Sequence, residues 1–323
     1  MSSKLIDFII LTGFLGSGKT TLLTDFLADG IRDTAVIVND IGEVNIDGAI
    51  IAVRSGVPMA TLSNGCVCCS LTNDLLFTIQ ALIDARRQSV DAPFARIVLE
   101  CSGISHPGAV MRSLSELAHL NMRVRIVCTY ACDQDVEKTG EFELAVAQLS
   151  AAHTIVLTRL DLSDREGILK AIERSRALGP MADLVVDEVR SRRAELAIGV
   201  IPKEASLLAP RAFELERKVT DDRHPRINTF VLSTHYAVDW HSFEAWLENL
   251  AGYLEERLLR VKGFLTVAEC KEQLLIQGVG QHFETPRRID TQSSTTRIVI
   301  IARDTSLEEV CTTVPKLQGA IFT

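Results

Sequence analysis

Residues 13–20 have the types and spacing of a phosphate-binding loop (P-loop), because they match the pattern G-x-x-x-x-G-K-T. In such a loop, backbone N–H groups surround the β-phosphate of a nucleotide. The ammonium of Lys19 would reach the β- and γ-phosphates, and the hydroxyl of Thr20 would bind Mg²⁺. The sequence therefore predicts a nucleoside-triphosphate site, with phosphate contacts from Gly13, Gly16, Ser17, Gly18, Lys19 and Thr20.

A carboxylate at the end of a second apolar run fits the same chemistry. The run over residues 96–99 reads as a buried strand and ends at Glu100. An acidic residue at the carboxyl end of a buried strand that follows a P-loop occupies the Walker B position, where it helps to hold Mg²⁺. We therefore expect Glu100 to act together with Lys19 and Thr20.

Three cysteines lie within four residues at Cys66, Cys68 and Cys69. Three thiolates can converge on one borderline cation such as Zn²⁺ and leave a coordination position open, which suits metal transfer better than a closed structural site. A redox pair, reactive thiols or small residues beneath a helix N-terminus would give the same spacing, so the spacing alone leaves metal binding open.

An acidic, glycine-punctuated loop at residues 39–48 lies between the P-loop and the cysteines. Asp40 and Glu43 are candidate switch residues there, and whether either one contacts the metal is left open. If a γ-phosphate orders this stretch, the metal and the nucleotide become coupled ligands, each changing the affinity of the other by the same factor.

The elements that must position these groups alternate between strand and helix. Apolar runs at residues 6–11, 34–39, 96–99, 124–130 and 154–157 read as strands, and the segments between them carry helical periodicity. We predict an α/β fold with a doubly wound, mostly parallel sheet, followed by a smaller α+β domain. The expected boundaries are residues 1–186 for the nucleotide-binding domain, 187–226 for a linker with short helical pieces, and 227–323 for the second domain.

Composition narrows the class of protein and of partner. The net charge of −8 and the absence of any Lys/Arg-rich run argue against a nucleic-acid partner. No apolar stretch approaches the ~20 residues of a membrane span, and the P-loop begins at residue 13, so we expect a cytoplasmic protein without a membrane partner. Cysteines in that compartment are thiols, and the isolated ones at 101, 128, 132, 270 and 311 read as core residues.

Taken together, these motifs resemble the CobW family of P-loop GTPases, which deliver metals and are related to the nickel-insertion GTPases for urease and hydrogenase. The resemblance rests on the P-loop, the loop at 39–48, N-G-C-V-C-C at 64–69, E-C-S-G at 100–103 and W-x-x-F-x-x-W-L at 240–247. It implies that Thr21 also contacts phosphate and that Cys66, Cys68 and Cys69 bind the metal. Relatives often carry a histidine-rich storage tract, whereas the seven histidines here are scattered.

The family reads guanine through an N-K-x-D motif, and the matching stretch here is Thr158-Arg159-Leu160-Asp161. The Asp161 carboxylate can still accept hydrogen bonds from the N1 and N2 groups of guanine, and the stem of Arg159 can cover the base. Thr158 cannot supply both an amide donor and a carbonyl acceptor, as asparagine does. We therefore expect GTP to be preferred, with weakened specificity.

The leading hypothesis is a GTPase metallochaperone that binds GTP, Mg²⁺ and a transition metal and times delivery of that metal to a client metalloprotein. Zn²⁺ is the first expectation from the ligand type, and Co²⁺ the second from the resemblance. Two alternatives are a nucleotide-gated metal-binding adaptor that hydrolyses little and a small-molecule P-loop kinase. The kinase alternative leaves the cysteine cluster unexplained.

Overall fold

A computed structural model describes residues 5–28, 33–39, 57–62, 71–114, 120–135, 142–200, 225–289, 295–313, 317 and 320–322. The chain divides into two compact units, Met1–Lys203 and Glu204–Thr323. Each unit has its own sheet and its own buried core. The two units are therefore described separately.

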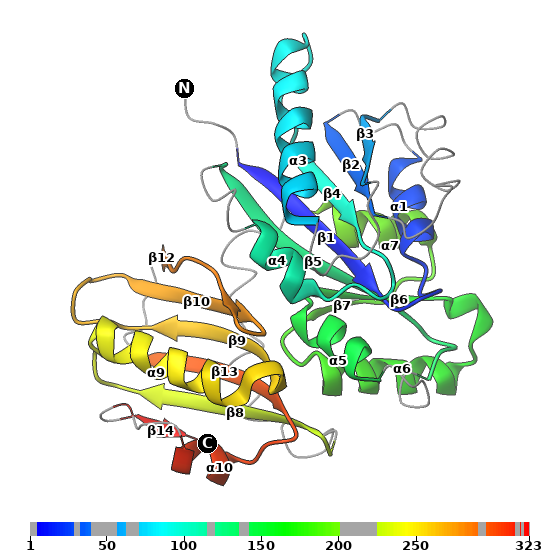
Figure 1. Cartoon of the computed structure of the whole chain (residues 1–323). Helices are drawn as coiled ribbons and strands as arrows, with labels where there is room; N and C mark the ends of the chain where they lie inside the picture. Colours follow the sequence, from blue (N-terminus) through cyan, green and yellow to red (C-terminus); the bar gives the residue numbers. More distant parts are fainter. Residues whose placement is uncertain are drawn as a thin grey trace. The chain divides into compact units, whose positions relative to one another are not determined.

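The first unit contains a sheet whose neighbouring strands all pair in parallel, as the sequence predicts. Its order is β3-β2-β4-β1-β5-β6-β7, with β1 at the centre (Figure 1). Because the strands are parallel, the P-loop after β1 and Glu100 at the end of β4 reach the same edge of the sheet. The strands are β1 Ile6–Gly13, β2 Thr34–Val38, β3 Met59–Thr61, β4 Arg96–Glu100, β5 Met122–Ala131, β6 Thr154–Thr158 and β7 Asp183–Val185.

Helices cover both faces of this sheet, so its central strands are buried on both sides. Ile9 and Leu11 of β1 pack in one cluster with Leu22, Leu23 and Phe26 of α1, whereas Phe8 and Ile10 point to the other face and are also fully buried. The helices are α1 Lys19–Leu27, α3 Leu71–Gln88, α4 Pro107–Leu114, α5 Phe142–Ala151, α6 Arg165–Leu178 and α7 Arg190–Ala194 (Figure 1).

Local signals set several helix boundaries. Gly18 begins α1 in the left-handed region at φ 88°, and the Asp164 carboxylate caps α6 by accepting from the N–H of Gly167 at 2.7 Å. The sequence predicts a helix over residues 107–120, and the structure describes helix for 107–114. A π-helix, Glu195–Gly199, continues α7, and together they pack against α1.

The second unit is an antiparallel sheet covered by one long helix. Its order is β11-β10-β9-β13-β8-β14, with β12 also paired to β10. Phe243, Trp246 and Leu250 of α9 pack on apolar residues of β8, β9 and β13, so the predicted α+β domain is confirmed. The elements are β8 Ile227–Thr234, α9 Trp240–Leu254, β9 Leu258–Leu265, β10 Gln273–Val279, β11 His282–Phe283, β12 Arg287–Ile289, β13 Thr296–Arg303, α10 Leu307–Thr313 and β14 Ile321–Phe322.

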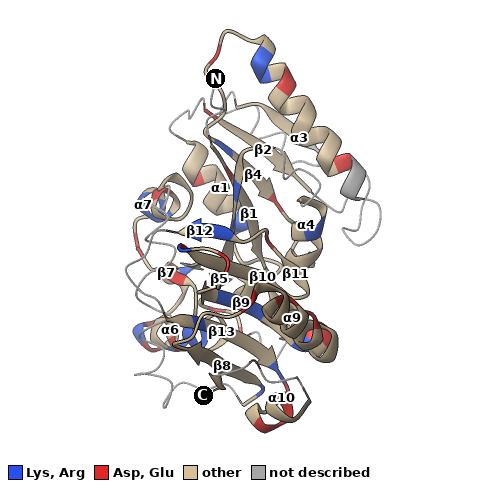
Figure 2. Cartoon of the chain, turned by 90° about the vertical axis from the view of Figure 1, so that its left-hand side faces the viewer, with Lys and Arg blue, Asp and Glu red and all other residues tan. Residues whose placement is uncertain are grey.

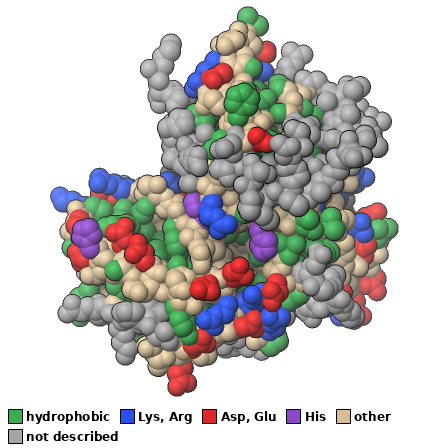
Figure 3. Space-filling view, viewed as in Figure 1, with side chains coloured by type: hydrophobic (Ala, Val, Ile, Leu, Met, Phe, Trp, Pro, Cys, Tyr) green, Lys and Arg blue, Asp and Glu red, His purple; other side chains and the backbone are tan. Residues whose placement is uncertain are grey.

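On the face drawn in Figure 3, acidic and basic side chains are interspersed and do not form one field of a single sign. Within the described ranges, every helix is too short or too polar to cross a membrane.

Candidate nucleotide-binding site

Glycine is required in the P-loop because of its backbone and its neighbours. Gly13, Gly16 and Gly18 have φ values of 139°, 71° and 88°, which L-residues with side chains rarely adopt. A Cβ on Gly13 would also overlap Thr129, both its side chain and its carbonyl oxygen. The loop can therefore pass directly over β5.

Lys19 lies buried inside the loop. Its Nζ donates hydrogen bonds to the carbonyl oxygens of Gly13 at 2.9 Å and Phe14 at 3.2 Å, and the residue is 8% exposed. These contacts hold a positive charge against the backbone of the P-loop. The arrangement suits the binding of a polyphosphate.

Thr20 and Glu100 come together as the sequence predicts for a Mg²⁺ site. The hydroxyl of Thr20 donates to Oε1 of Glu100 at 2.5 Å, and the carboxylate is buried at the end of β4. A hydroxyl and a carboxylate oxygen side by side are hard donors of the kind that Mg²⁺ takes together with phosphate oxygens. The donor set of these two residues therefore fits the metal of a nucleoside-triphosphate complex.

Thr158 contacts the P-loop directly. Its hydroxyl donates to the carbonyl oxygen of Ser17 at 2.7 Å, and its own carbonyl accepts from the N–H of Cys132 at 3.1 Å. The hydroxyl of Ser17 pairs in turn with the hydroxyl of Thr129 at 2.6 Å. Thr158 therefore fastens the end of β6 to the P-loop, a role that the sequence pattern did not predict.

Arg159 and Asp161 follow on the same edge of the sheet. Arg159 adopts a left-handed backbone at φ 54°, and its guanidinium pairs with Asp133 at 2.9 Å. An added Cβ on Gly16 would lie 3.4 Å from Nη2 of Arg159, so this side chain is at the P-loop. Asp161 lies exposed in the short 3₁₀ helix Leu160–Leu162.

Two further contacts shape the loop, and the sequence predicts neither of them. Gly103 follows Glu100 and touches Leu15 so closely that an added Cβ would lie 2.7 Å from the Leu15 nitrogen. The amide of Gln148, buried in α5, donates to the carbonyls of Gly103 at 3.0 Å and Ser105 at 3.1 Å. A glutamine on the apolar face of α5 is the signal that could have identified this contact.

Two isolated cysteines near the site are core residues. Burial raises the pKa of Cys101 and of Cys128 to about 12, although the positive charge of Lys19 acts in the opposite direction. Both thiols stay protonated at neutral pH and fill the sheet, as the sequence predicts. The sequence also predicts core positions for Cys132, Cys270 and Cys311, but these three residues are partly exposed.

The predicted metal ligands Cys66, Cys68 and Cys69 and the predicted switch residues Asp40 and Glu43 lie outside the described residues. Among the residues that are described, no group of three or more His, Cys, Asp or Glu side chains could hold a metal ion. The metal assignment therefore stays a prediction from the sequence.

The parallel sheet, the glycine loop and the Thr20–Glu100 pair define the class: a P-loop nucleotide-binding protein. The family model described as CobW/HypB/UreG, nucleotide-binding domain, matches residues 7–185. The model described as cobalamin synthesis protein cobW C-terminal domain matches residues 227–314. The chain belongs to the CobW family of P-loop GTPases.

Named relatives cover most of the chain. It is 30% identical over 289 residues to the zinc chaperone YjiA of Escherichia coli, covering 85% of this chain and 86% of the relative. It is 28% identical over 344 residues to the zinc chaperone CobW of Pseudomonas aeruginosa, covering 91% and 87%. A crystal structure of Zn(II)-bound YjiA GTPase from E. coli superposes with a TM-score of 0.65 at 25% identity, covering 97% of this chain and all of the other.

Proposed function

We propose that this protein is a cytoplasmic GTP-hydrolysing metallochaperone that binds zinc through Cys66, Cys68 and Cys69 and couples the nucleotide state to delivery of the metal to a client metalloprotein. The observation that carries the proposal is the contact of Thr20 with Glu100 beside the buried Lys19, because it assembles the parts of a triphosphate site. The names of the relatives, which are zinc chaperones, support zinc over cobalt.

The chain's own residues divide the work of hydrolysis. The P-loop N–H groups and Lys19 hold the β- and γ-phosphates and offset the charge that develops as water attacks in line. Thr20 and Glu100 would hold Mg²⁺, which neutralises charge on the same phosphates. Asp161 accepts hydrogen bonds from the base, and Arg159 covers it.

The proposed domain organisation separates nucleotide and metal binding from contact with the client. Residues 1–186 bind the nucleotide and carry the metal ligands, and residues 227–323 form the second domain. The predicted linker, 187–226, begins with α7 and the π-helix, which pack on α1 in the first unit. That second domain is the proposed contact surface for a client. Its position in the chain and the family model that matches it support this assignment.

The test is a zinc titration of the reduced protein against a competing chelator, in Mg²⁺ with GDP or with a non-hydrolysable GTP analogue. We expect zinc affinity to differ between the two nucleotides, because coupled ligands change each other's affinity by the same factor. The difference should vanish in Cys66→Ser and in Lys19→Ala and persist in Cys311→Ser, a control cysteine in the second unit. Equal zinc affinity in all nucleotide states would contradict the proposed coupling.

A second readout separates the GTPase from a passive adaptor. Phosphate release from GTP should be measurable in the wild type and should fall strongly in Lys19→Ala, because that charge acts on the transferring phosphoryl group. Zinc binding without phosphate release would favour the adaptor.

A further inference from the structure

The purine site lacks one donor that N-K-x-D proteins supply through asparagine. The hydroxyl of Thr158 is already donated to Ser17 at 2.7 Å, so it has no proton left for a base. Guanine presents two acceptors, O6 and N7, where adenine presents the N6 amino donor and N7. A side-chain donor for guanine at this edge therefore has to come from a residue other than Thr158.

Arg193 is a buried cation at the end of the same strand. It lies in α7, whose basic residues are coloured blue in Figure 2, and it is 6% exposed. Its Nη1 donates to the carbonyl of Leu157 at 3.2 Å, directly before Thr158. The pairing of β6 with β7 ends at Val156, so this carbonyl lies one residue beyond the last paired position. A guanidinium has five N–H donors in a planar fork, so one such bond leaves donors for a ligand.

Acidic groups around Arg193 include the predicted base-reading carboxylate. Burial lowers the pKa of Arg193, whereas the negative charges of Asp25 and Asp161 and the Cys132 side chain raise it, and Arg190 lowers it further. Arg193 bonds to the carbonyl of Leu157 at 3.2 Å, and Asp161 lies in the 3₁₀ helix that follows β6, so both residues belong to the region where this strand ends. A donor and an acceptor in this region are what the Watson–Crick and Hoogsteen edges of guanine require.

An ion pair fixes α7 relative to the P-loop helix. Arg190 donates to both carboxylate oxygens of Asp25 in α1, at 2.9 and 2.8 Å. Ala194, Ala197 and Ile198 pack in the same apolar cluster as Leu22 and Leu23 of α1. Because α1 begins in the P-loop, these contacts hold Arg193 at a set place relative to the phosphates, as a specificity residue requires.

We propose that Arg193 is a purine-specificity residue that donates to O6 and N7 of guanine while Asp161 accepts from N1 and N2. Together they replace the asparagine of N-K-x-D and oppose the N6 amino group of adenine. This inference rests on the proposed function, since it requires a guanine nucleotide at the P-loop. It assigns α7 a role that no motif in the sequence indicates.

The first test uses the unmodified protein and four nucleotides: GDP, ADP, 7-deaza-GDP, which lacks the N7 acceptor, and 6-thio-GDP, whose sulfur is a weak acceptor. Binding is followed by calorimetry in Mg²⁺. We expect ADP and at least one of the two analogues to bind about tenfold or more weakly than GDP, the range of a base contact by arginine. Equal affinity of the protein for GDP and both analogues would overturn the proposal.

The second test uses Arg193→Met with Arg192→Met as the matched control, because the side chain of Arg192 is 73% exposed and pairs with Asp187. We expect Arg193→Met to weaken the binding of GDP about tenfold and to leave the affinity for ADP unchanged. The variant should also bind GDP and its two analogues with similar affinity. An equal loss for GDP and ADP, with the discrimination retained, would mean that Arg193 only supports the fold.

Two controls keep the outcomes separate. Urea unfolding of Arg193→Met and of Arg193→Lys shows whether the buried site tolerates the change, and if neither variant folds, the analogue series on the wild type decides. If neither the wild type nor Lys19→Ala binds any purine nucleotide, that result contradicts the proposed GTPase function and not only the role of Arg193.

Discussion

At the scale of the single residue, the contact between Gly103 and Leu15 predicts that adding one methyl group at Gly103 destabilises the protein. A Cβ on Gly103 would lie 2.7 Å from the backbone nitrogen of Leu15, so the P-loop would have to move. We expect Gly103→Ala to lower the free energy of unfolding by about 1–3 kcal/mol, the usual cost of overpacking. We also expect it to weaken the binding of GDP. Urea unfolding and calorimetry measure the two effects.

Gly252 provides the matched control, because an added Cβ there meets nothing within 4 Å and the residue lies inside α9. Alanine has the higher helix propensity, so Gly252→Ala should raise stability by about 0.4–1 kcal/mol and leave GDP binding unchanged. If Gly103→Ala behaves like Gly252→Ala, the contact with Leu15 does not shape the P-loop.

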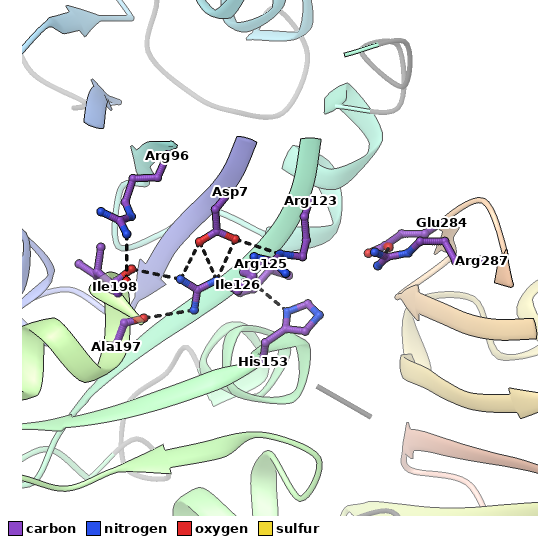
Figure 4. Close-up of polar contacts among 11 residues, drawn as sticks. Asp7, Arg96, Arg123, Arg125, Ile126, His153, Ala197, Ile198, Glu284 and Arg287 are labelled. Carbon is purple, nitrogen blue, oxygen red and sulfur yellow. Dashed lines mark hydrogen bonds and ion pairs between the residues drawn. The ribbon is translucent and has the colours of Figure 1, made fainter. Parts of the chain in front are cut away.

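At the scale of the elements, one buried ion cluster joins the starts of three strands to the π-helix. Arg125 contacts Asp7 at 2.8 Å and donates to the carbonyls of Ala197 at 3.3 Å and Ile198 at 3.2 Å (Figure 4). Arg96 donates to the carbonyl of Gly199 at 2.9 Å. These bonds satisfy carbonyls at the end of a helix, which otherwise lack partners.

Asp7→Asn should therefore destabilise the first unit by about 3–5 kcal/mol, because it leaves the Arg125 charge buried without its carboxylate. Asp33→Asn is the comparison, because the Asp33 carboxylate is 47% exposed and lies 3.8 Å from the buried Arg96 guanidinium, which keeps its bond to the Gly199 carbonyl. We expect a loss of about 1 kcal/mol or less, as for surface ion pairs. Urea unfolding followed by circular dichroism gives both values. Similar, small losses of unfolding free energy in the two variants would show that the buried ion cluster adds little to stability.

In the second unit, Glu309 of α10 accepts hydrogen bonds from the hydroxyl of Tyr253 at 2.7 Å and from Arg257 at 2.8 Å. These two bonds, together with hydrogen bonds from Thr305 and from the Ser306 backbone, lower its pKa from 4.5 to about 2. Since the folded-state pKa is depressed, the carboxylate stabilises the unit above pH 4.5, and that contribution is lost as the pH falls from 4.5 towards 2.

We therefore expect wild type to be more stable than Glu309→Gln at pH 7 and the difference to shrink at pH 3.5. Tryptophan fluorescence in urea is the measurement, because both tryptophans, Trp240 and Trp246, lie in α9. A difference that is the same at both pH values would assign the effect to packing rather than to charge.

The sequence predicts elements whose signals are local. The P-loop and Glu100 at the end of its strand follow from spacing alone, and the structure contains both. Contacts between distant residues, such as Thr158 with Ser17 and Asp7 with Arg125, depend on which strands become neighbours. Spacing carries no information about that.

The shortest strands and the proposed role of α7 could not be predicted from the sequence either. β11 and β14 have two residues each, too few to show a period of two, and they form because a neighbouring strand is present. Arg193 looks like any surface arginine in a charged stretch. Only the packing of α7 on α1 buries it beside the end of β6.

At the scale of the whole molecule, each unit has the parts of an independent folding unit, namely a sheet and an apolar core. A nucleotide that binds only the folded first unit stabilises that unit by RT ln(1 + [L]/Kd), about 2.7 kcal/mol at 100 times Kd. We therefore expect saturating GDP with Mg²⁺ to protect amides of residues 1–203 from hydrogen exchange in moderate urea.

The unfolding of the second unit is visible separately, since both tryptophans belong to it. If the two units unfold independently, GDP leaves the tryptophan-monitored urea midpoint unchanged while it raises protection in the first unit. A GDP-dependent shift of that midpoint by the same free energy would mean that the units unfold as one cooperative body. Lys19→Ala should abolish the effect of GDP in both measurements, because without the P-loop ammonium the diphosphate loses its central charge partner.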